Sequence, residues 1–274
     1  MMKTSFSTLA CPQWGLTQVL QAATDFGYSG VELRVLSNEL DLWKLPEFQP
    51  GARGCTRRQI EDHNIFIPCV GTSACFHSPE AAERQSNYDA ALRMADLAAD
   101  LGARSIRVFG DRVQTGCVRE VTATWVANSL SQLAERLRPA RVEVWLETHG
   151  DFATTASVSE ILDQIDEGSI GVIWDPANAF AQNEEEPLLP SSMAARIRHV
   201  HLKDLRRDVP SGAPQYVLAG EGEFPFKTMF ESLAQIGYES FVSFEWEKHW
   251  HPELAPPEVA LPSFIEWWKS RELS

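Results

Sequence analysis

Residues 142–175 read VEVWLETHGDFATTASVSEILDQIDEGSIGVIWD, and this stretch contains the unit from which the rest of the chain is built. An apolar, β-branched run at 142–147 is followed by a helical pattern at about 157–166 and by a second such run at 169–174. Each run ends on a carboxylate or directly before one. Short β-rich runs separated by a helix predict parallel strands joined by a right-handed crossover.

The same alternation recurs along the whole chain and predicts eight strands. They lie at Thr4–Leu9, Gly30–Arg34, Phe66–Thr72, Ser105–Phe109, Val142–Glu147, Ser169–Trp174, Ile197–Lys203 and Ser240–Trp246. The helical patterns between them cover 16–26, 78–101, 118–137, 157–166, 187–196, 225–236 and 258–270. Eight such units in 274 residues predict a single-domain α/β fold over residues 1–274, a closed (β/α)8 TIM barrel. The G-x-G-x-x-G fingerprint of an open doubly wound sheet does not follow the first strand.

Two of the predicted helices carry recognisable end signals. The helix at 16–26 stops at Gly27, a residue that readily adopts a left-handed cap. The tripeptide Ser78-Pro79-Glu80 predicts the start of another helix, with Ser78 as N-cap and Pro79 at the first helical position. That helix stops at Gly102.

The composition disfavours several classes of protein. Hydrophobic residues at 44% and charged residues at 23% are ordinary for a globular chain, and no apolar run approaches the roughly 18 residues of a membrane span. A net charge of −14 disfavours nucleic acid as a partner. Five cysteines without C-x-x-C spacing argue against a disulfide framework and a thiolate zinc site. Because the N-terminus also lacks a secretory apolar region, we expect a cytoplasmic protein with no membrane partner.

Four consecutive predicted strands end near side chains that can bind a metal ion: Glu147, Asp175, His201 and Glu245. Active sites of TIM barrels form where the carboxyl ends of the strands meet, so these side chains are expected to converge. Three carboxylates at one mouth would repel one another without a cation. The mixed oxygen and nitrogen set suits Mn²⁺, Mg²⁺, Co²⁺ or Zn²⁺. Taken singly, each residue is better explained as a solvated carboxylate or a hydrogen-bonded histidine, whereas all four at strand ends together favour a metal ion.

These strand ends belong to an ordered set of motifs. The motifs are Gly30-Val31-Glu32-Leu33-Arg34, Leu146-Glu147-Thr148-His149-Gly150, Trp174-Asp175-Pro176-Ala177-Asn178, His199-Val200-His201-Leu202-Lys203-Asp204, Gly220-Glu221-Gly222-Glu223 and Phe244-Glu245-Trp246-Glu247. The set resembles the sugar phosphate isomerase/epimerase family of the xylose-isomerase-like TIM barrel superfamily over nearly the whole chain. The resemblance implies one divalent metal ion on the four residues above, Mn²⁺ before Zn²⁺, Mg²⁺ or Co²⁺. It also implies that Glu147 and Glu245 act as acid and base on opposite faces of a bound sugar.

Five further polar residues are predicted to contact the substrate: Glu32, His149, Asn178, Lys203 and Arg207. For Glu32 the alternative is an ion pair with Arg34, and for His149 it is a structural role. Lys203 shares the parity of His201 along its strand. The resemblance to ketose 3-epimerases implies a substrate-orienting arginine at the position of Arg207, with a surface arginine as the alternative. Asn178 stands where many relatives carry histidine, so it can hydrogen-bond a hydroxyl group but cannot shuttle protons.

The resemblance and the strand-end residues together predict a metal-dependent isomerase or epimerase of carbohydrate metabolism. Its substrate would be a small sugar or polyol ketone, which loses the proton next to the carbonyl to form an enediolate. A keto-cyclitol (inosose-type) dehydratase on the same metal site is the first alternative. An abasic-site endonuclease is disfavoured by the acidic charge and by the absence of histidine at 72–74, 110–111 and 178.

Two expectations about the substrate and the assembly follow from the same residues. The acidic segment 220–223 favours an unphosphorylated substrate, since phosphate in TIM barrels commonly binds the loops after strands seven and eight. The cations Lys203, Arg207 and Lys248 leave a phosphorylated substrate as the alternative. A sugar-binding protein with a relict site is disfavoured because all four ligand positions carry competent residues. The resemblance implies a homodimer or a homotetramer.

Overall fold

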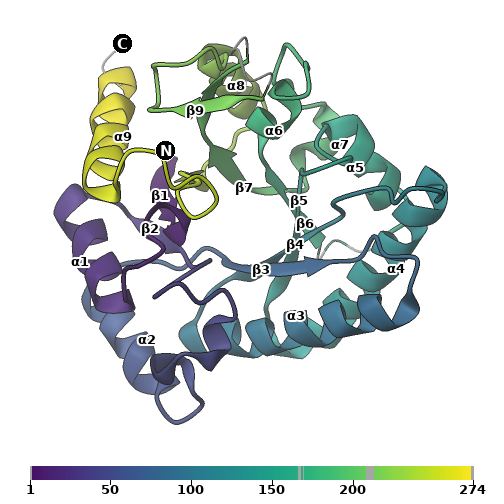
Figure 1. The fold of residues 1–274 in the computed structure, drawn as a ribbon, viewed down its shortest axis with the longest axis horizontal. Coiled ribbons are helices and arrows are strands. Elements are labelled where there is room, and N and C mark those ends of the chain that lie inside the picture. The colour runs from purple at the N-terminus through teal and green to yellow at the C-terminus, as the bar shows by residue number, and fades with distance from the viewer. Residues whose placement is uncertain (1, 166–167, 169, 208–212, 273–274) are drawn as a thin grey trace.

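The computed structural model describes residues 2–165, 168, 170–207 and 213–272. Within these residues, eight parallel strands form one sheet in the order β2-β1-β10-β7-β6-β5-β4-β3. Their bounds are β1 Lys3–Ser7, β2 Gly30–Glu32, β3 Val70–Cys75, β4 Ser105–Phe109, β5 Glu143–Glu147, β6 Ile170–Trp174, β7 Ile197–Leu202 and β10 Phe241–Phe244. Figure 1 shows the strands at the centre of the molecule and the helices in a ring around them.

The two ends of this sheet, β2 and β3, join through backbone hydrogen bonds. Parallel bridges pair Gly30 with Phe66 and Leu33 with Val70. The amide of Val31 donates to the carbonyl of Phe66 at 2.9 Å. The sheet therefore closes on itself, the predicted (β/α)8 barrel is confirmed, and the carboxyl ends of the eight strands meet at one mouth.

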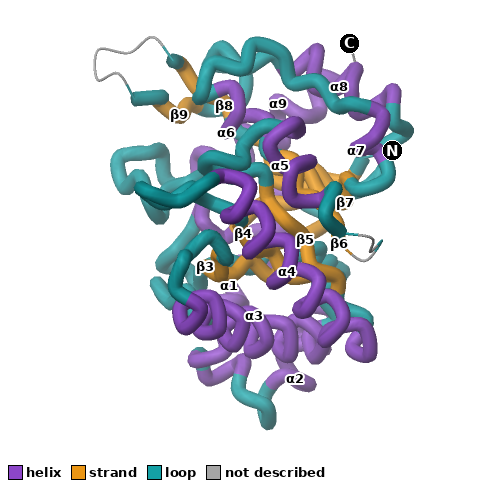
Figure 2. Tube along the Cα trace, turned by 90° about the vertical axis from the view of Figure 1, so that its right-hand side faces the viewer, coloured by secondary structure: helices purple, strands orange, loops and turns teal. Residues whose placement is uncertain are grey.

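The helices of the described residues pack on the outer face of the barrel. They are α1 Leu16–Phe26, α2 Arg53–Asp62, α3 Ala81–Leu101, α4 Arg119–Leu137, α5 Thr155–Leu162, α6 Pro176–Phe180, α7 Ser191–Ala194, α8 Phe226–Gln235 and α9 Pro257–Glu272. A short antiparallel hairpin that the sequence did not predict follows β7, with strands β8 (Asp204–Arg206) and β9 (Gln215–Val217). Figure 2 shows this hairpin at one end of the molecule.

The predicted helix ends are partly confirmed. Both α1 and α3 stop at a left-handed glycine, Gly27 at φ 87° and Gly102 at φ 74°. The predicted start at Ser78 is wrong, because α3 begins at Ala81 and the Ser78 hydroxyl accepts from the amide of Glu80 in the preceding turn. The cap therefore stabilises the turn before the helix rather than its first turn.

Several other elements differ from the prediction: α6 was not predicted, and α7 covers only Ser191–Ala194 of the predicted 187–196. Helix α2 was missed because it buries only Thr56 and Ile60 and so has no apolar stripe. The third strand begins later than predicted, at Val70, because Pro68 cannot donate a backbone hydrogen bond to a neighbouring strand. Residues 166 and 169, where one predicted helix ends and one predicted strand begins, lie outside the described residues.

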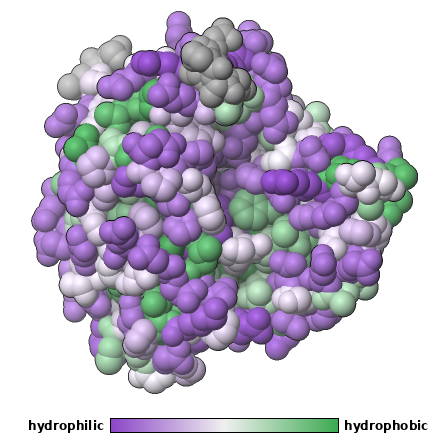
Figure 3. Space-filling model, viewed as in Figure 1, coloured by the Kyte–Doolittle hydropathy of each residue, from purple (hydrophilic) through white to green (hydrophobic). Residues whose placement is uncertain are grey.

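Apolar side chains fill the space between the barrel and its helices. Phe6 and Phe244 on the strands and Leu20 and Val126 on the helices are completely buried. Hydrophilic residues cover most of the face shown in Figure 3, with hydrophobic residues in small separate groups. No helix among the described residues is both long and apolar enough to cross a membrane.

Candidate metal centre

Four side chains at the carboxyl ends of neighbouring strands converge inside the barrel mouth. Glu147 ends β5, Asp175 follows β6 directly, His201 lies near the end of β7 and Glu245 follows β10. None is more than 3% exposed, and one ligand atom from each lies within 4.8 Å of the others. The predicted set of four residues is thus brought together by the fold.

The imidazole Nδ1 of His201 is the centre of this cluster. It lies 3.2 Å from Glu245 Oε1, 3.6 Å from Glu147 Oε1 and 3.9 Å from Asp175 Oδ2. His201 Nδ1 is buried and has no hydrogen-bond partner, and Asp175 Oδ2, which is ion-paired with Lys203 Nζ at 2.9 Å, is buried and accepts no hydrogen bond. Buried polar atoms without partners are costly, and a divalent cation would satisfy both at once. The donor set of three carboxylates and one imidazole therefore fits a divalent metal ion.

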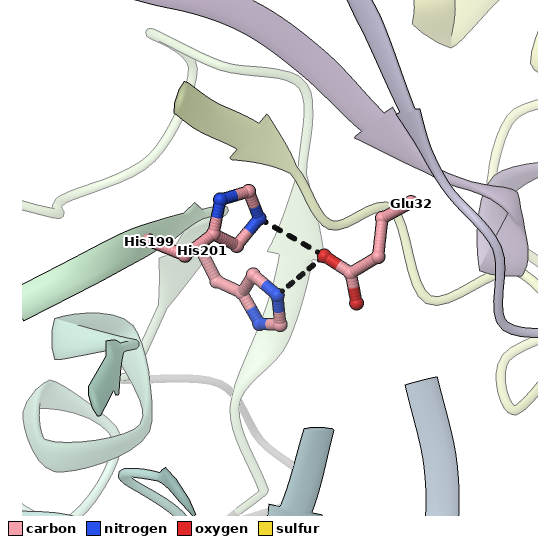
Figure 4. A group of neighbouring side chains, drawn as sticks. All are labelled: Glu32, His199 and His201. Atoms are coloured by element: carbon pink, nitrogen blue, oxygen red, sulfur yellow. Dashed lines mark hydrogen bonds and ion pairs between the residues drawn. The ribbon is translucent and has the colours of Figure 1, made fainter. Parts of the chain in front are cut away.

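The other nitrogen of His201 is held from behind by Glu32 (Figure 4). Glu32 Oε2 accepts from His201 Nε2 at 2.8 Å and from His199 Nε2 at 3.1 Å. A carboxylate that binds one imidazole nitrogen directs the other toward a metal ion. Burial raises the pKa of Glu32, but the charges and hydrogen bonds of the two histidines overcome this effect, and the carboxyl group stays ionised.

The structure does not place Glu32 in the cavity wall, where its predicted contact with a substrate would lie. Its side chain has no exposed surface, because β2 places it inside the barrel beneath His201. The alternative ion pair with Arg34 is not formed either, and the Arg34 guanidinium donates to the Ser73 hydroxyl instead. The signal that could have indicated the true partner is the pair of histidines at 199 and 201, which share a face of β7.

Two buried cations hold the glutamates of the cluster. Arg107, inside β4, donates from Nη1 to Glu147 Oε2 at 2.7 Å, and Lys203 Nζ lies 2.8 Å from Glu245 Oε2 and 2.9 Å from Asp175 Oδ2. Burial raises the pKa of Glu147, whereas Arg107 lowers it, with a net decrease. The pKa of Glu245 also falls, because His201 and Lys203 outweigh burial. Arg107 was not predicted as part of the site, because it lies inside β4 and not at a strand end.

A cavity of about 420 Å³ opens over the cluster, a size usual for small-molecule sites. Its wall includes Glu147, Glu245 and two of the predicted substrate contacts, His149 and Lys203. The His149 ring packs on Phe109, and its Nδ1 lies 3.0 Å from Asp111 Oδ1. Both predicted contacts therefore face the space in which a substrate would lie.

The remaining two predicted contacts, Asn178 and Arg207, are not part of the cavity wall. Asn178 donates from Nδ2 to the carbonyl of Thr148 at 3.0 Å and so connects the ends of β5 and β6. Arg207 forms two hydrogen bonds to Glu185, at 3.0 and 2.9 Å, and its guanidinium lies over the Phe180 ring. These partners account for both side chains without a substrate.

Comparison with known proteins assigns the family of this fold. The family model of the xylose isomerase-like TIM barrel matches residues 20–271, so the chain belongs to that family. This result confirms the superfamily that the strand-end motifs indicated.

Individual relatives are more distant. The chain is 26% identical over 222 residues to the uncharacterized protein YihM of Escherichia coli (strain K12), which is 80% of this chain and 62% of that protein. It is 28% identical over 122 residues to the inosose dehydratase of Geobacillus thermodenitrificans (strain NG80-2), which is 39% of this chain and 40% of that enzyme. The chain thus matches less than two thirds of the length of either relative.

Among solved structures, the chain is similar to the crystal structure of IOLI protein with a binding zinc atom. The TM-score is 0.80 at 18% sequence identity, over 97% of this chain and 96% of that one. At this identity the similarity establishes the barrel fold.

Proposed function

We propose that this protein is a divalent-metal-dependent isomerase or epimerase that moves a proton at the carbon next to the carbonyl of a sugar or polyol ketone. The observation that carries the proposal is the arrangement of Glu147 and Glu245. Each directs one oxygen toward His201 Nδ1 and the other toward a different cation, Arg107 or Lys203. Both glutamates also line the cavity. Family membership and the similarity to an inosose dehydratase support a polyhydroxylated ketone as substrate.

The chemistry divides between the metal ion and the two glutamates. When bound by the four ligands, a divalent ion (Mn²⁺, or else Zn²⁺, Mg²⁺ or Co²⁺) polarises a carbonyl and stabilises the charge left when the adjacent carbon loses its proton. One of Glu147 and Glu245 removes that proton, and the other returns a proton to the opposite face or to the neighbouring carbon. Arg107 and Lys203 fix the two carboxylates through charge-assisted hydrogen bonds.

The test is turnover in D₂O with a panel of ketoses and inososes and added Mn²⁺. Deuterium should appear at the carbon next to the carbonyl, as a lost proton signal in the NMR spectrum. Glu245→Gln should bind metal but react about 10²–10⁴-fold more slowly. The matched control is Glu143→Gln at the opposite end of β5, which should keep its rate. A Glu245→Gln enzyme with bound metal and near-normal turnover would rule out the two-glutamate mechanism.

A dehydratase on the same site is the second candidate, and the position of His149 favours it. Loss of a hydroxyl group needs a proton donor, and His149 lies in the cavity wall beside the carboxylate of Asp111. Product analysis separates the candidates, because dehydration lowers the product mass by one water and isomerisation leaves it unchanged. In a dehydratase, His149→Gln should slow water loss while exchange of the carbon-bound proton continues.

A further inference from the structure

A buried guanidinium without an acidic partner lies in the cavity wall beside the candidate metal centre. Arg34 is 4% exposed and lines the cavity. Its Nη2 donates to the Ser73 hydroxyl at 2.8 Å, and its Nη1 is buried without a hydrogen-bond partner. No ion pair joins it to a carboxylate within the described parts of the chain. Because buried charges are normally paired, this cation lacks a counter-charge.

The other cations of the wall already have carboxylate partners. Arg107 lies 2.7 Å from Glu147 Oε2, and Lys203 contacts three carboxylates. Arg112 is 76% exposed, and its Nε lies 3.8 Å from the carboxylate of Asp111. Among these cations of the cavity wall, Arg34 therefore differs in being buried without a carboxylate partner.

Surrounding residues hold Arg34 in this position. The Thr8 hydroxyl accepts from the backbone amide of Arg34 at 2.8 Å. A Cβ atom at Gly71 would lie 2.7 Å from Arg34 Cδ, so only glycine leaves room for the side chain. Burial, followed by the nearby charge of Arg107, lowers the pKa of Arg34 to about 9, and the charges of Glu147, Glu32 and Glu245 offset this decrease only in part.

The charge of the whole buried set supports the same conclusion. Besides His199 and His201, whose imidazoles would be uncharged with a metal ion bound, seven ionisable side chains of the site are at most 4% exposed. They are the carboxylates Glu32, Glu147, Asp175 and Glu245 and the cations Arg34, Arg107 and Lys203. A divalent ion on the four ligands would leave this set with one net positive charge. Glu247, which also contacts Lys203, is 16% exposed and so is partly solvated. One negative charge would neutralise the set, and a phosphate dianion would exceed it.

We propose that Arg34 binds a carboxylate group of the substrate, so that the substrate is a polyhydroxylated keto acid rather than a neutral sugar. This inference rests on the proposed function and names its substrate class. A guanidinium offers planar, paired N–H donors that match a carboxylate, and its second terminal nitrogen is still without an acceptor. The pairing would satisfy the buried donor and compensate the buried charge together.

The test measures equilibrium binding and needs no turnover. The probes are quinate (a cyclohexane polyol with a carboxylate), its neutral methyl ester, and myo-inositol 1-phosphate, each titrated calorimetrically into the metal-loaded protein. Quinate should bind about 10–100-fold more tightly than the ester, the gain usual for a charge-assisted hydrogen bond. In Arg34→Gln the two should bind equally, while metal content stays at one ion per chain. Arg34→Lys keeps the charge and should keep part of the preference.

Three results would overturn the proposal: equal binding of quinate and its ester by the wild type, an undiminished preference in Arg34→Gln, or tighter binding of the phosphate. If Arg34→Gln does not fold, the binding of quinate and its ester by the wild type and by Arg34→Lys still tests the proposal. Failure of the proposed function is seen separately, as lack of bound metal or of deuterium incorporation with the ketose and inosose panel. A protein that exchanges protons of neutral ketones yet ignores the charge of quinate would keep the proposed function and lose the keto-acid assignment.

Discussion

The carboxylate of Glu32 lies directly behind His201, with Oε2 2.8 Å from Nε2 on the side of the ring away from the other three candidate ligands. Because an ionised carboxylate only accepts hydrogen bonds, Nε2 carries a proton, and a metal ion in the cluster would bind the lone pair of Nδ1. Glu32 is thus a positioning residue for the metal centre that we propose.

The first prediction concerns this positioning. Glu32→Gln should weaken divalent metal binding by about 10–100-fold, because the amide no longer fixes the His201 tautomer with a full charge. Metal affinity is measured by competition with a chromophoric chelator, and ¹⁵N NMR of the metal-free protein reports which ring nitrogens of His201 carry a proton. The control is Ser243→Ala, which removes a buried hydroxyl without a partner at the β10 position paired with His201. Unchanged affinity and an unchanged tautomer in Glu32→Gln would contradict the prediction.

The second prediction concerns the metal ion itself. The purified protein should hold about one divalent ion per chain, removable by a chelator, and Asp175→Ala or His201→Ala should lower this content sharply. Binding displaces protons from the ligands, so affinity should fall as the pH is lowered. Elemental analysis after dialysis measures the content, with Glu143→Gln as a carboxylate control outside the cluster. Full occupancy in both alanine variants would remove the site assignment.

The third prediction tests the packing that holds Arg34. Gly71→Ala should lower the free energy of unfolding by about 1–3 kcal/mol, because its methyl group would overlap the Arg34 stem. Gly54→Ala is the matched control, since a Cβ there meets only the end of the Arg58 side chain at 3.9 Å. At this site in α2 the same substitution should stabilise the protein by about 0.4–1 kcal/mol. Urea unfolding measures the free energy of unfolding of both variants. If Gly71→Ala and Gly54→Ala have equal effects, the Arg34 side chain can move aside without cost, which contradicts the prediction.

The fourth prediction concerns the cysteines. All five are free thiols, so titration after unfolding without reductant should find five. In the native protein Cys55 is exposed and should react first, whereas burial raises the pKa of Cys11 and Cys69 and should keep them inert. Burial, followed by the charge of Asp111, raises the pKa of Cys75 to about 11, so its reaction should accelerate as the pH rises. Fewer than five thiols after unfolding would contradict this reading.

The barrel and the four-residue cluster could be predicted from the sequence because both depend on local patterns. Short apolar runs between helical patterns define parallel strands, and in a closed barrel the carboxyl ends of neighbouring strands must meet. The topology of the barrel therefore places a polar residue at such an end, such as Glu147 or Asp175, at the barrel mouth. Helix α2 escaped detection because it has no apolar stripe from which to recognise it.

The roles of the supporting residues were decided only by the tertiary structure. Glu32 lies 167 and 169 positions from the two histidines that it binds, and Arg107 lies 40 positions from Glu147. The alternation of residues along a strand predicts that a side chain points into the barrel. It does not predict which side chain of another strand contacts it. The lack of a carboxylate partner for Arg34 depends in the same way on distances across the barrel. Buried charges pair according to their distance in the folded protein, and this distance cannot be predicted from the separation of the residues in the sequence.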